Sequence, residues 1–448
     1  MPANPGLSES WSKPNGNNGG IAKSCTGGGC SSRKPFSKDE NGVQTGPEYI
    51  RILLVFVTNQ CNLACTNCCA PVFTSKAKSQ YLKWEDFKGA IDTFMDPSQV
   101  PYSGQKTISI QGGESFLAYP LLLKCAQYIQ RFEDKPNVYI HTNGTILKPA
   151  WIKALQDLDI DVLFSVDGDR DGNDHYRKYP DSKVERSVWD NFMKNFEKIP
   201  DKKGLGLNMT LRPHNLDGII KTLDWFSHNG IKFANLETDC YHYWTPDELA
   251  ALGKFWDDLH DYYVGRTKNE GHCPFHLGMV HDGIERSVYL NRGEHWWRSC
   301  CQLVLGSDGN FYDCESSQFF DYENPKEFNW EEISNQYTCN QAGEGKGVDW
   351  DKRQRYMDAA DARLGSLKAD SEWQHICPRL YYSMEKTDQL AKDTGKEGGK
   401  VKDGMIMAAN MSEVSKIYRN GIMKIATTLM SHPSFQELYI QNRSVQGS

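Results

Sequence analysis

The chain has 448 residues, of which 39% are hydrophobic and 24% charged, and its formal net charge is -7. This composition is typical of a soluble globular protein that is long enough for one large domain and a smaller one. Acidic and basic residues are interspersed, so no broad cationic surface for nucleic acid is expected. The longest apolar run is too short to span a membrane, and the first residues lack the apolar stretch of a secretory signal. We therefore expect a cytoplasmic protein, whose 14 cysteines favour thiolate ligands or redox chemistry over disulfide bonds.

Residues 1–48 have a low-complexity composition rich in glycine, serine, asparagine and lysine. Such a segment cannot bury enough apolar surface to fold alone, so we expect a flexible tail. Cys25 and Cys30 lie in this tail, where an incidental pair is the simpler interpretation and a ligand role is the alternative.

From residue 49 onward, short apolar runs alternate with amphipathic stretches. The predicted strands are residues 52–58, 107–111, 138–142, 162–166, 205–211 and 233–237. The predicted helices are residues 83–94, 119–132, 149–158, 188–198 and 216–229. Strands that alternate with helices predict βα units of a parallel sheet. Because the composition changes near residue 265, before eight units are complete, we expect an α/β fold with a partial (β/α)6 TIM-like barrel over residues 49–265.

The rest of the chain predicts two further segments. Residues 266–380 are rich in Cys, Gly, Trp and His, which indicates a small cysteine-containing α+β module held by something other than a large core. Residues 381–448 predict a charged linker and a C-terminal helical tail, with the helix running from about residue 411 to 438.

Three closely spaced cysteines, Cys61, Cys65 and Cys68, follow the first predicted strand. Three thiolates on one loop can bind three corners of a [4Fe-4S] cluster and leave the fourth iron open, as an open metal position marks a catalytic site. The alternative is a zinc site, which usually needs four ligands. Cys69 could supply the fourth, but its side chain directly follows that of Cys68 and would point elsewhere. The spacing therefore favours an iron–sulfur cluster over zinc.

The C-x3-C-x2-C spacing after a first strand resembles the signature of the radical S-adenosylmethionine (SAM) superfamily. Three further motifs of that family appear in the same order at strand ends. Residues 111–114 (QGGE) are similar to its GGE motif, residues 141–145 (HTNGT) to its TNG segment, and residues 164–168 (FSVDG) to the S-x-D-G of its larger members. Together they cover roughly residues 50 to 240.

The resemblance implies that SAM binds the open iron of the cluster, and that one-electron reduction of SAM yields a 5′-deoxyadenosyl radical that abstracts a substrate hydrogen atom. Glycines would let the backbone approach the ligand, and Glu114 could accept a hydrogen bond from the SAM ammonium. Arg186 is expected to pair with the SAM carboxylate, with Arg177 as the alternative. The expected SAM contacts are Gly112, Gly113, Glu114, Thr142, Asn143, Ser165, Asp167 and Arg186.

A second group of cysteines lies downstream, where an Asp308-Gly309 turn between two strand-like runs predicts a hairpin. This pattern resembles the opening of the SPASM and shorter twitch modules of the superfamily, which hold auxiliary iron–sulfur clusters. The late cysteine run of a full SPASM module is absent, so we expect one auxiliary [4Fe-4S] cluster rather than two. Its expected ligands are Cys301, Cys314 and Cys377, with Cys300 and Cys339 competing for a further place. Buried reduced cysteines are the alternative.

Candidate catalytic residues follow the sixth strand and the second cysteine group. Asp239 or Glu315 could take a proton from the substrate, and Cys240 could return a hydrogen atom to a substrate radical. A structural role is the competing interpretation for each of the three.

These motifs together predict a radical SAM oxidoreductase that works anaerobically with an electron donor such as flavodoxin or ferredoxin. The expected substrate is a peptide or protein, as for a sulfatase maturase or a maturase of ribosomally made peptides. The alternative is a dehydrogenase or related enzyme that acts on a small natural-product or amino-sugar precursor. A non-catalytic zinc or iron–sulfur protein would have no need of the GGE and S-x-D-G motifs at strand ends.

Overall fold

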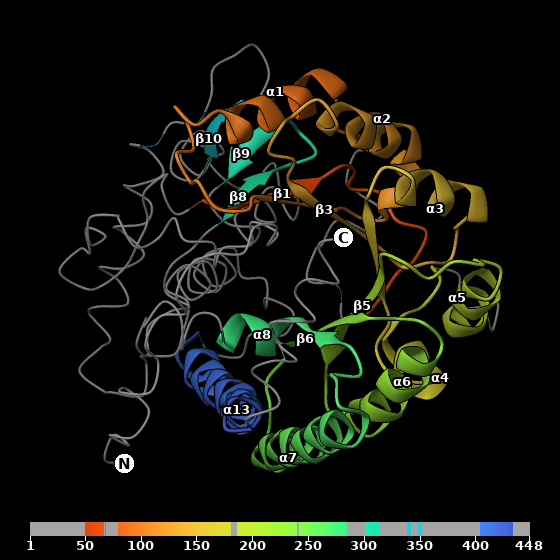
Figure 1. Ribbon diagram of the computed structural model, residues 1–448, viewed down its shortest axis with the longest axis vertical. Coiled ribbons are helices and arrows are strands. Elements are labelled where there is room, and N and C mark those ends of the chain that lie inside the picture. The colour runs from red at the N-terminus through yellow and green to blue at the C-terminus, as the bar shows by residue number, and fades with distance from the viewer. Residues whose placement is uncertain are drawn as a thin grey trace, which may run out of the picture.

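The computed structural model describes residues 50–66, 68, 79–180, 186–239, 242–284, 302–312, 338–341, 348, 350 and 404–432. Within these residues ten strands form one sheet, in the order β10-β9-β8-β1-β2-β3-β4-β5-β6-β7. Pairing is parallel from β8 through β1 to β7, and antiparallel between β8, β9 and β10. Helices lie in an arc on the outer side of the parallel strands (Figure 1). The predicted α/β partial barrel is confirmed.

All six predicted strands are present, with ends that differ from the prediction by at most a few residues. The strands of the barrel are β1 (Ile52–Phe56), β2 (Thr107–Gln111), β3 (Asn137–Thr142), β4 (Asp161–Ser165), β5 (Leu205–Leu211), β6 (Phe233–Thr238) and the short β7 (His276–Leu277). The helices are α1 (Trp84–Met95), η4 (Ser115–Ala118), α2 (Tyr119–Ile129), α3 (Pro149–Gln156), α4 (Arg170–Tyr176), α5 (Val188–Phe196), α6 (Leu216–His228), α7 (Pro246–Glu270) and α8 (Gly278–Ile284).

The sequence analysis missed α4, α7, α8 and the short η4. The start of α7 carries a strong local signal, since Thr245 and Glu248 form a capping box around Pro246. Its interior is highly charged and contains two glycines, which obscures the apolar stripe. The helix is stabilised by packing, because Trp256, Leu259 and other apolar side chains on one side are buried.

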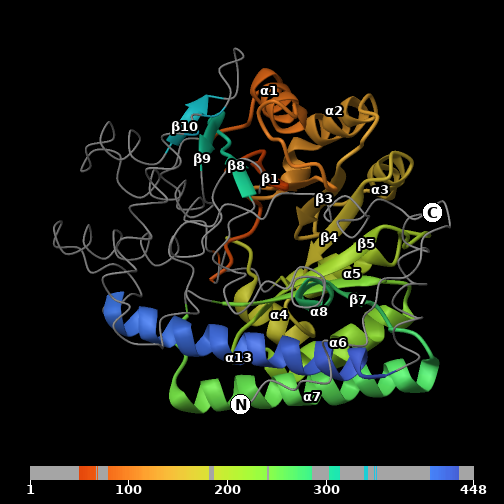
Figure 2. The same ribbon diagram turned by 60° about the vertical axis from the view of Figure 1, so that its left-hand side comes forward.

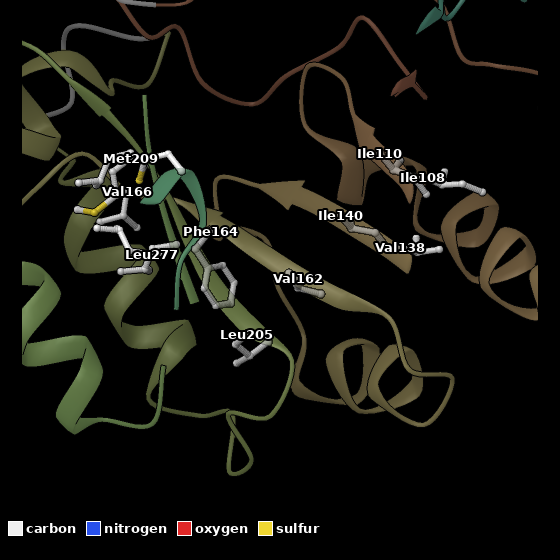
Figure 3. Close-up of a cluster of buried hydrophobic side chains, with 14 of the residues drawn as sticks. Ile108, Ile110, Val138, Ile140, Val162, Phe164, Val166, Leu205, Met209 and Leu277 are labelled. Carbon is white, nitrogen blue, oxygen red and sulfur yellow. The ribbon is translucent and has the colours of Figure 1, made fainter. Parts of the chain in front are cut away.

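Alternating side chains give each strand two different faces. Residues that point toward the helices are apolar and buried, and Figure 3 shows Ile108, Ile110, Val138, Ile140, Val162, Phe164, Val166, Leu205, Met209 and Leu277 in this layer. The residues between them point to the opposite side, which we call the inner face. This face includes polar side chains such as Ser109, His141, Ser165, Asn208 and Asn235. The hydrophobic core therefore lies between strands and helices and leaves the inner face for chemistry.

The predicted hairpin around Asp308 is confirmed. It joins β8 (Gln302–Leu305) to β9 (Asn310–Tyr312), and its turn contains Gly309 with a φ of 83°, where L residues are strained. A further strand, β10 (Thr338–Gln341), pairs with β9. Because β8 also pairs with β1, the hairpin extends the barrel sheet itself. The domain boundaries at residues 48, 265 and 380 stay predictions.

The C-terminal helix α13 (Gly404–Met430) starts earlier than predicted and runs alongside α7 (Figure 2). Asn410 fixes its first turns, since it accepts a hydrogen bond from Trp244 N at 2.8 Å and donates one to Trp244 O at 2.6 Å. Further along, Gly421 lies against the ring of Trp256, leaving no room for a Cβ atom. None of the helices in the described parts of the chain is long and apolar enough to cross a membrane.

We expect Gly421→Ala to destabilise the protein, because its methyl group would collide with the ring of Trp256. Overpacking of this kind costs about 1–3 kcal/mol. Gly253→Ala on α7 is the matched control, since nothing lies within 4 Å of its added Cβ and alanine favours a helix by about 0.5–1 kcal/mol over glycine. Urea unfolding followed by circular dichroism should shift to lower urea for the first variant and slightly upward for the second. A Gly421→Ala midpoint at or above that of Gly253→Ala would contradict this packing.

Candidate active site

The loops that leave β1 and β2 are joined along their backbones. Gly113 N donates to Thr58 O and Glu114 N donates to Gln60 O, both at 2.8 Å. A Cβ on Gly112 would lie 2.6 Å from Thr58 O, so only glycine allows this approach. We expected Gly112 and Gly113 to make room for a ligand. In the structure, the space at Gly112 is taken by the neighbouring backbone.

The three cysteines follow on the β1 loop, with Cys61 and Cys65 half-buried and Cys68 exposed. The middle of this loop, which we call the cysteine loop (residues 61–66 and 68), is bonded to the segment that follows α4. Ala64 N donates to Lys178 O at 2.6 Å, and Thr66 N donates to Tyr176 O at 2.9 Å. Backbone bonds therefore hold the loop from the side opposite to β2 as well.

Glu114 connects the β2 loop to the β3 loop. Its carboxylate is buried and accepts hydrogen bonds from Thr142 Oγ1 at 2.6 Å, Asn143 N at 2.8 Å and Phe116 N at 3.0 Å. Burial raises the pKa of Glu114, and these three donors oppose the rise. Oε2 accepts only one of these three hydrogen bonds, the one from Asn143 N. Oε2 is therefore the oxygen that an ammonium group of a ligand would contact. The hydrogen bonds of Glu114 therefore hold the β2 loop and the β3 loop together.

Asn143 extends this network to the cysteine loop. Its Nδ2 donates to Asn62 Oδ1 at 2.9 Å and approaches Cys61 Sγ at 3.8 Å, while its Oδ1 accepts from Thr145 N and Oγ1. Asn62 Nδ2 in turn donates to Thr145 Oγ1 at 2.7 Å. Residues of the TNG segment thus position the first cysteine through Asn62, a residue that the sequence analysis did not single out.

Arg177, rather than Arg186, is the arginine near the cysteines. Arg177 forms a buried ion pair with Asp167, with Nε 2.8 Å from Oδ2 and a hydrogen bond of 3.1 Å from Nη2 to Oδ1. Asp167 also accepts a hydrogen bond from Thr210 N, which ties it to β5. Arg186 is exposed and stacks 4.6 Å from the ring centre of Tyr179. The geometry favours Arg177 as the SAM partner and makes Asp167 the residue that holds it.

Burial is the first cause of the raised pKa of the Cys61 and Cys65 thiols. Burial raises the pKa of Cys61 to about 12, the N–H of Leu63 opposes this, and Glu114, Cys65 and Cys68 add to the rise. Burial also raises the pKa of Cys65, and the Arg177 guanidinium is the first group to oppose it. At neutral pH these thiols are therefore protonated in the metal-free protein, and a metal that binds them must displace the protons.

The donor set fits an iron–sulfur cluster. Cys61 Sγ accepts a hydrogen bond from Leu63 N at 3.3 Å in addition to the contact with Asn143, and such N–H groups stabilise cluster thiolates. Among the described residues, no group of three or more His, Cys, Asp or Glu side chains is arranged to hold a single metal ion. A cuboidal cluster does not need that arrangement, because its irons occupy separate corners.

The profile of the Radical SAM superfamily matches residues 55–252, which contain the cysteine loop and every strand-end motif described above. Over residues 55–252, this chain is a member of the radical SAM superfamily. The family implies a [4Fe-4S] cluster and SAM, and the chain is a radical SAM enzyme.

Known relatives extend this similarity. An uncharacterized protein of Methanocaldococcus jannaschii is 29% identical over 133 residues, which cover 29% of this chain and 43% of that protein, less than half its length. The cysteine-type anaerobic sulfatase-maturating enzyme of Clostridium perfringens is 22% identical over 295 residues, which cover 59% of this chain and 74% of that enzyme. Native anSMEcpe with bound AdoMet has the same fold, with a TM-score of 0.56 at 17% identity, covering 84% of this chain and 99% of that one.

The inner face of this radical SAM barrel carries a line of polar residues toward β6. Ser165 pairs in register with Asn208, and Asn208 with Asn235. Asn235 Nδ2 donates to Asn208 Oδ1 at 3.0 Å and to Glu237 Oε1 at 2.9 Å. Glu237 is exposed near the end of β6, and desolvation raises the pKa of its carboxylate while the Asn235 hydrogen bond opposes the rise. Sequence analysis missed Glu237, although its place near the end of a predicted strand was the signal.

Asp239, an expected catalytic residue, forms an ion pair in the structure. Its buried carboxylate is ion-paired with Arg212, and the Arg212 guanidinium lies over the ring of Tyr176. The ion pair joins the ends of β5 and β6. Glu237 is the exposed acidic side chain near the end of β6 that a substrate can reach. The expected residues Cys240, Glu315, Cys301, Cys314 and Cys377 lie outside the described residues.

We expect Gly112→Ala to separate the β1 and β2 loops, because its Cβ would lie 2.6 Å from the Thr58 backbone oxygen. Gly104→Ala is the matched control, since its Cβ would lie 2.5 Å from the hydroxyl end of Tyr102, which can swing away. Iron content after anaerobic reconstitution should fall severalfold for the first variant and stay near wild type for the second. Equal iron content in both would show that the close approach of the loops is not required.

Proposed function

We propose that this enzyme is a radical SAM oxidoreductase that abstracts a hydrogen atom from a peptide or protein. One observation carries the proposal: three cysteines lie on a loop that is bonded through its backbone to the segment holding Arg177 and whose preceding residues are bonded to the GGE loop. The cysteine loop and the GGE loop follow the carboxyl ends of β1 and β2, where active sites of such barrels form, and the Arg177 segment follows α4 in the connection after β4.

Cys61, Cys65 and Cys68 would hold the cluster, and Arg177 would pair with the SAM carboxylate. Thr142 and Asn143 would shape the methionine side of the site while they fix Glu114. Ser165 on the inner face, next to Asn208, is the proposed contact for the ribose or carboxylate of SAM. When bound, the reduced cluster and SAM supply one-electron cleavage of the sulfonium and a radical that takes a hydrogen atom from the substrate.

The proposed substrate side lies at the open end of the polar line, at Glu237. This carboxylate makes a hydrogen bond to Asn235, and the described residues form no ion pair with it. A basic or hydrogen-bond-donating group of the substrate would bind this exposed carboxylate through a charge-assisted hydrogen bond.

An auxiliary [4Fe-4S] cluster remains part of the proposal, with Cys301, Cys314 and Cys377 as its ligands. The hairpin of β8 and β9 supports it, because Cys301 directly precedes β8 and Cys314 follows β9 by two residues. Such a cluster would supply an acceptor for the second electron of an oxidation, with Glu315 or Glu237 taking the proton and Cys240 as the alternative hydrogen donor. Flavodoxin or ferredoxin is the proposed electron donor.

A peptide is favoured over a small molecule by the relatives that this chain is similar to. One is a sulfatase-maturating enzyme, and anSMEcpe has also been solved with AdoMet and the Cp18Cys peptide, with a TM-score of 0.56 at 16% identity to this chain. The peptide substrate itself stays a proposal.

We expect anaerobic reconstituted enzyme with dithionite to convert SAM to 5′-deoxyadenosine and methionine. Replacing Cys61, Cys65 and Cys68 together by alanine should abolish the products, because the cluster would lose its ligands. Cys125→Ala is the matched control, since this thiol is free but buried in the core on α2. Loss of 5′-deoxyadenosine in the control, or its persistence in the triple variant, would count against the assignment.

We expect Glu237→Gln to lower conversion of a cysteine-containing sulfatase peptide about tenfold more than it lowers SAM cleavage, a difference of about 1.4 kcal/mol in barrier. The charge would be lost while the amide keeps the size of the side chain. Asp157→Asn, which changes an exposed carboxylate next to α3, is the control. Mass spectrometry of the peptide and chromatography of 5′-deoxyadenosine give the two rates, and a parallel fall in both would remove Glu237 from the substrate side.

A further inference from the structure

Arg177 is fixed against the cysteine loop by the backbone on both of its sides. Tyr176 O accepts from Thr66 N, and Lys178 O accepts from Ala64 N. The two bonds run in opposite order along the two segments, so Arg177 stands across from Cys65. The charge of Arg177 acts on Cys65, and Cys65 and Cys68 act on Arg177 in return.

The guanidinium has little freedom in this position. Asp167 binds it through both carboxylate oxygens, and the exposed side-chain fractions are 13% for Arg177 and 0% for Asp167. Asp167 is itself held by Thr210 N at 2.9 Å, and its own N–H donates to Asn173 Oδ1 at 3.2 Å. A buried pair that is joined by one hydrogen bond and a second close charge contact is screened little by salt, so its two charges act strongly on their surroundings.

We propose that the Asp167–Arg177 pair sets the reduction potential of the cluster held by the cysteine loop. The inference rests on the proposed function, because it needs a cluster at Cys61, Cys65 and Cys68. A reduced cluster carries one more negative charge than an oxidised one, so a fixed cation nearby stabilises the reduced state and raises the potential. The Asp167 carboxylate also acts on Cys65, with the opposite sign, and offsets part of this effect.

The charges predict opposite shifts for the two partners. Arg177→Gln removes the cation, leaves Asp167 uncompensated and should lower the potential. Asp167→Asn removes the anion and should raise it, while Arg177→Lys keeps the charge and should stay close to wild type. Each shift should reach about a tenfold change in the equilibrium constant for reduction, which is about 59 mV for one electron. A role confined to binding SAM would give no shift when SAM is absent.

The experiment is a redox titration of the full-length, anaerobically reconstituted enzyme, monitored by electron paramagnetic resonance without SAM. Arg170→Gln is the matched control, because Arg170 belongs to the same helix α4 but pairs with Asp190 at the surface. Opposite shifts of Arg177→Gln and Asp167→Asn, with the control unchanged, support the proposal.

Two results would overturn it: potentials of both variants equal to that of Arg170→Gln, or shifts of both in the same direction, which indicate a disturbed fold rather than charge. If Arg177→Gln assembles no cluster, Asp167→Asn alone decides, and a potential that does not rise overturns the proposal. A wild-type protein that binds no cluster at all would instead overturn the proposed function beneath it.

Discussion

The active site depends on backbone hydrogen bonds that hold the cysteine loop from two sides. A loop in the mouth of a barrel exposes many N–H and C=O groups that need partners. Gly113 and Glu114 supply them on the β2 side, and Tyr176 and Lys178 supply them on the other. Three thiolates can bind one cluster only if the loop that carries them keeps its shape. These hydrogen bonds are therefore a precondition for the chemistry of the site.

The family motifs act here largely by fixing loops to one another. Gly112 admits the backbone of Thr58, Glu114 binds the β3 loop, and Asp167 holds Arg177. These residues are buried or enclosed, so few of their polar atoms face the inner side of the barrel. In our proposal, Arg177 and the polar line that ends at Glu237 make the contacts with SAM and substrate. The enzyme thus separates residues that shape the site from residues that meet the ligand, as precise placement of reacting groups requires.

The sequence predicted the six barrel strands and the cysteine loop because both depend on local patterns, apolar runs and cysteine spacing. It did not predict α7, whose stability comes from packing against distant residues. It also favoured Arg186 over Arg177, a choice that depends on how the chain turns after α4. Glu237 and Asp239 look equivalent in sequence, and only the ion pair of Asp239 with Arg212 separates them. Such distinctions depend on contacts between distant segments, which a single sequence does not contain.

The central claim is that the cysteine loop binds a [4Fe-4S] cluster, and iron and sulfide analysis tests it most directly. Anaerobically reconstituted wild-type protein would be compared with the variant in which Cys61, Cys65 and Cys68 are all alanine. The account predicts that the variant loses about four irons and as many sulfides per chain, whether or not an auxiliary cluster is present. A variant with the same iron and sulfide content as wild type would contradict it.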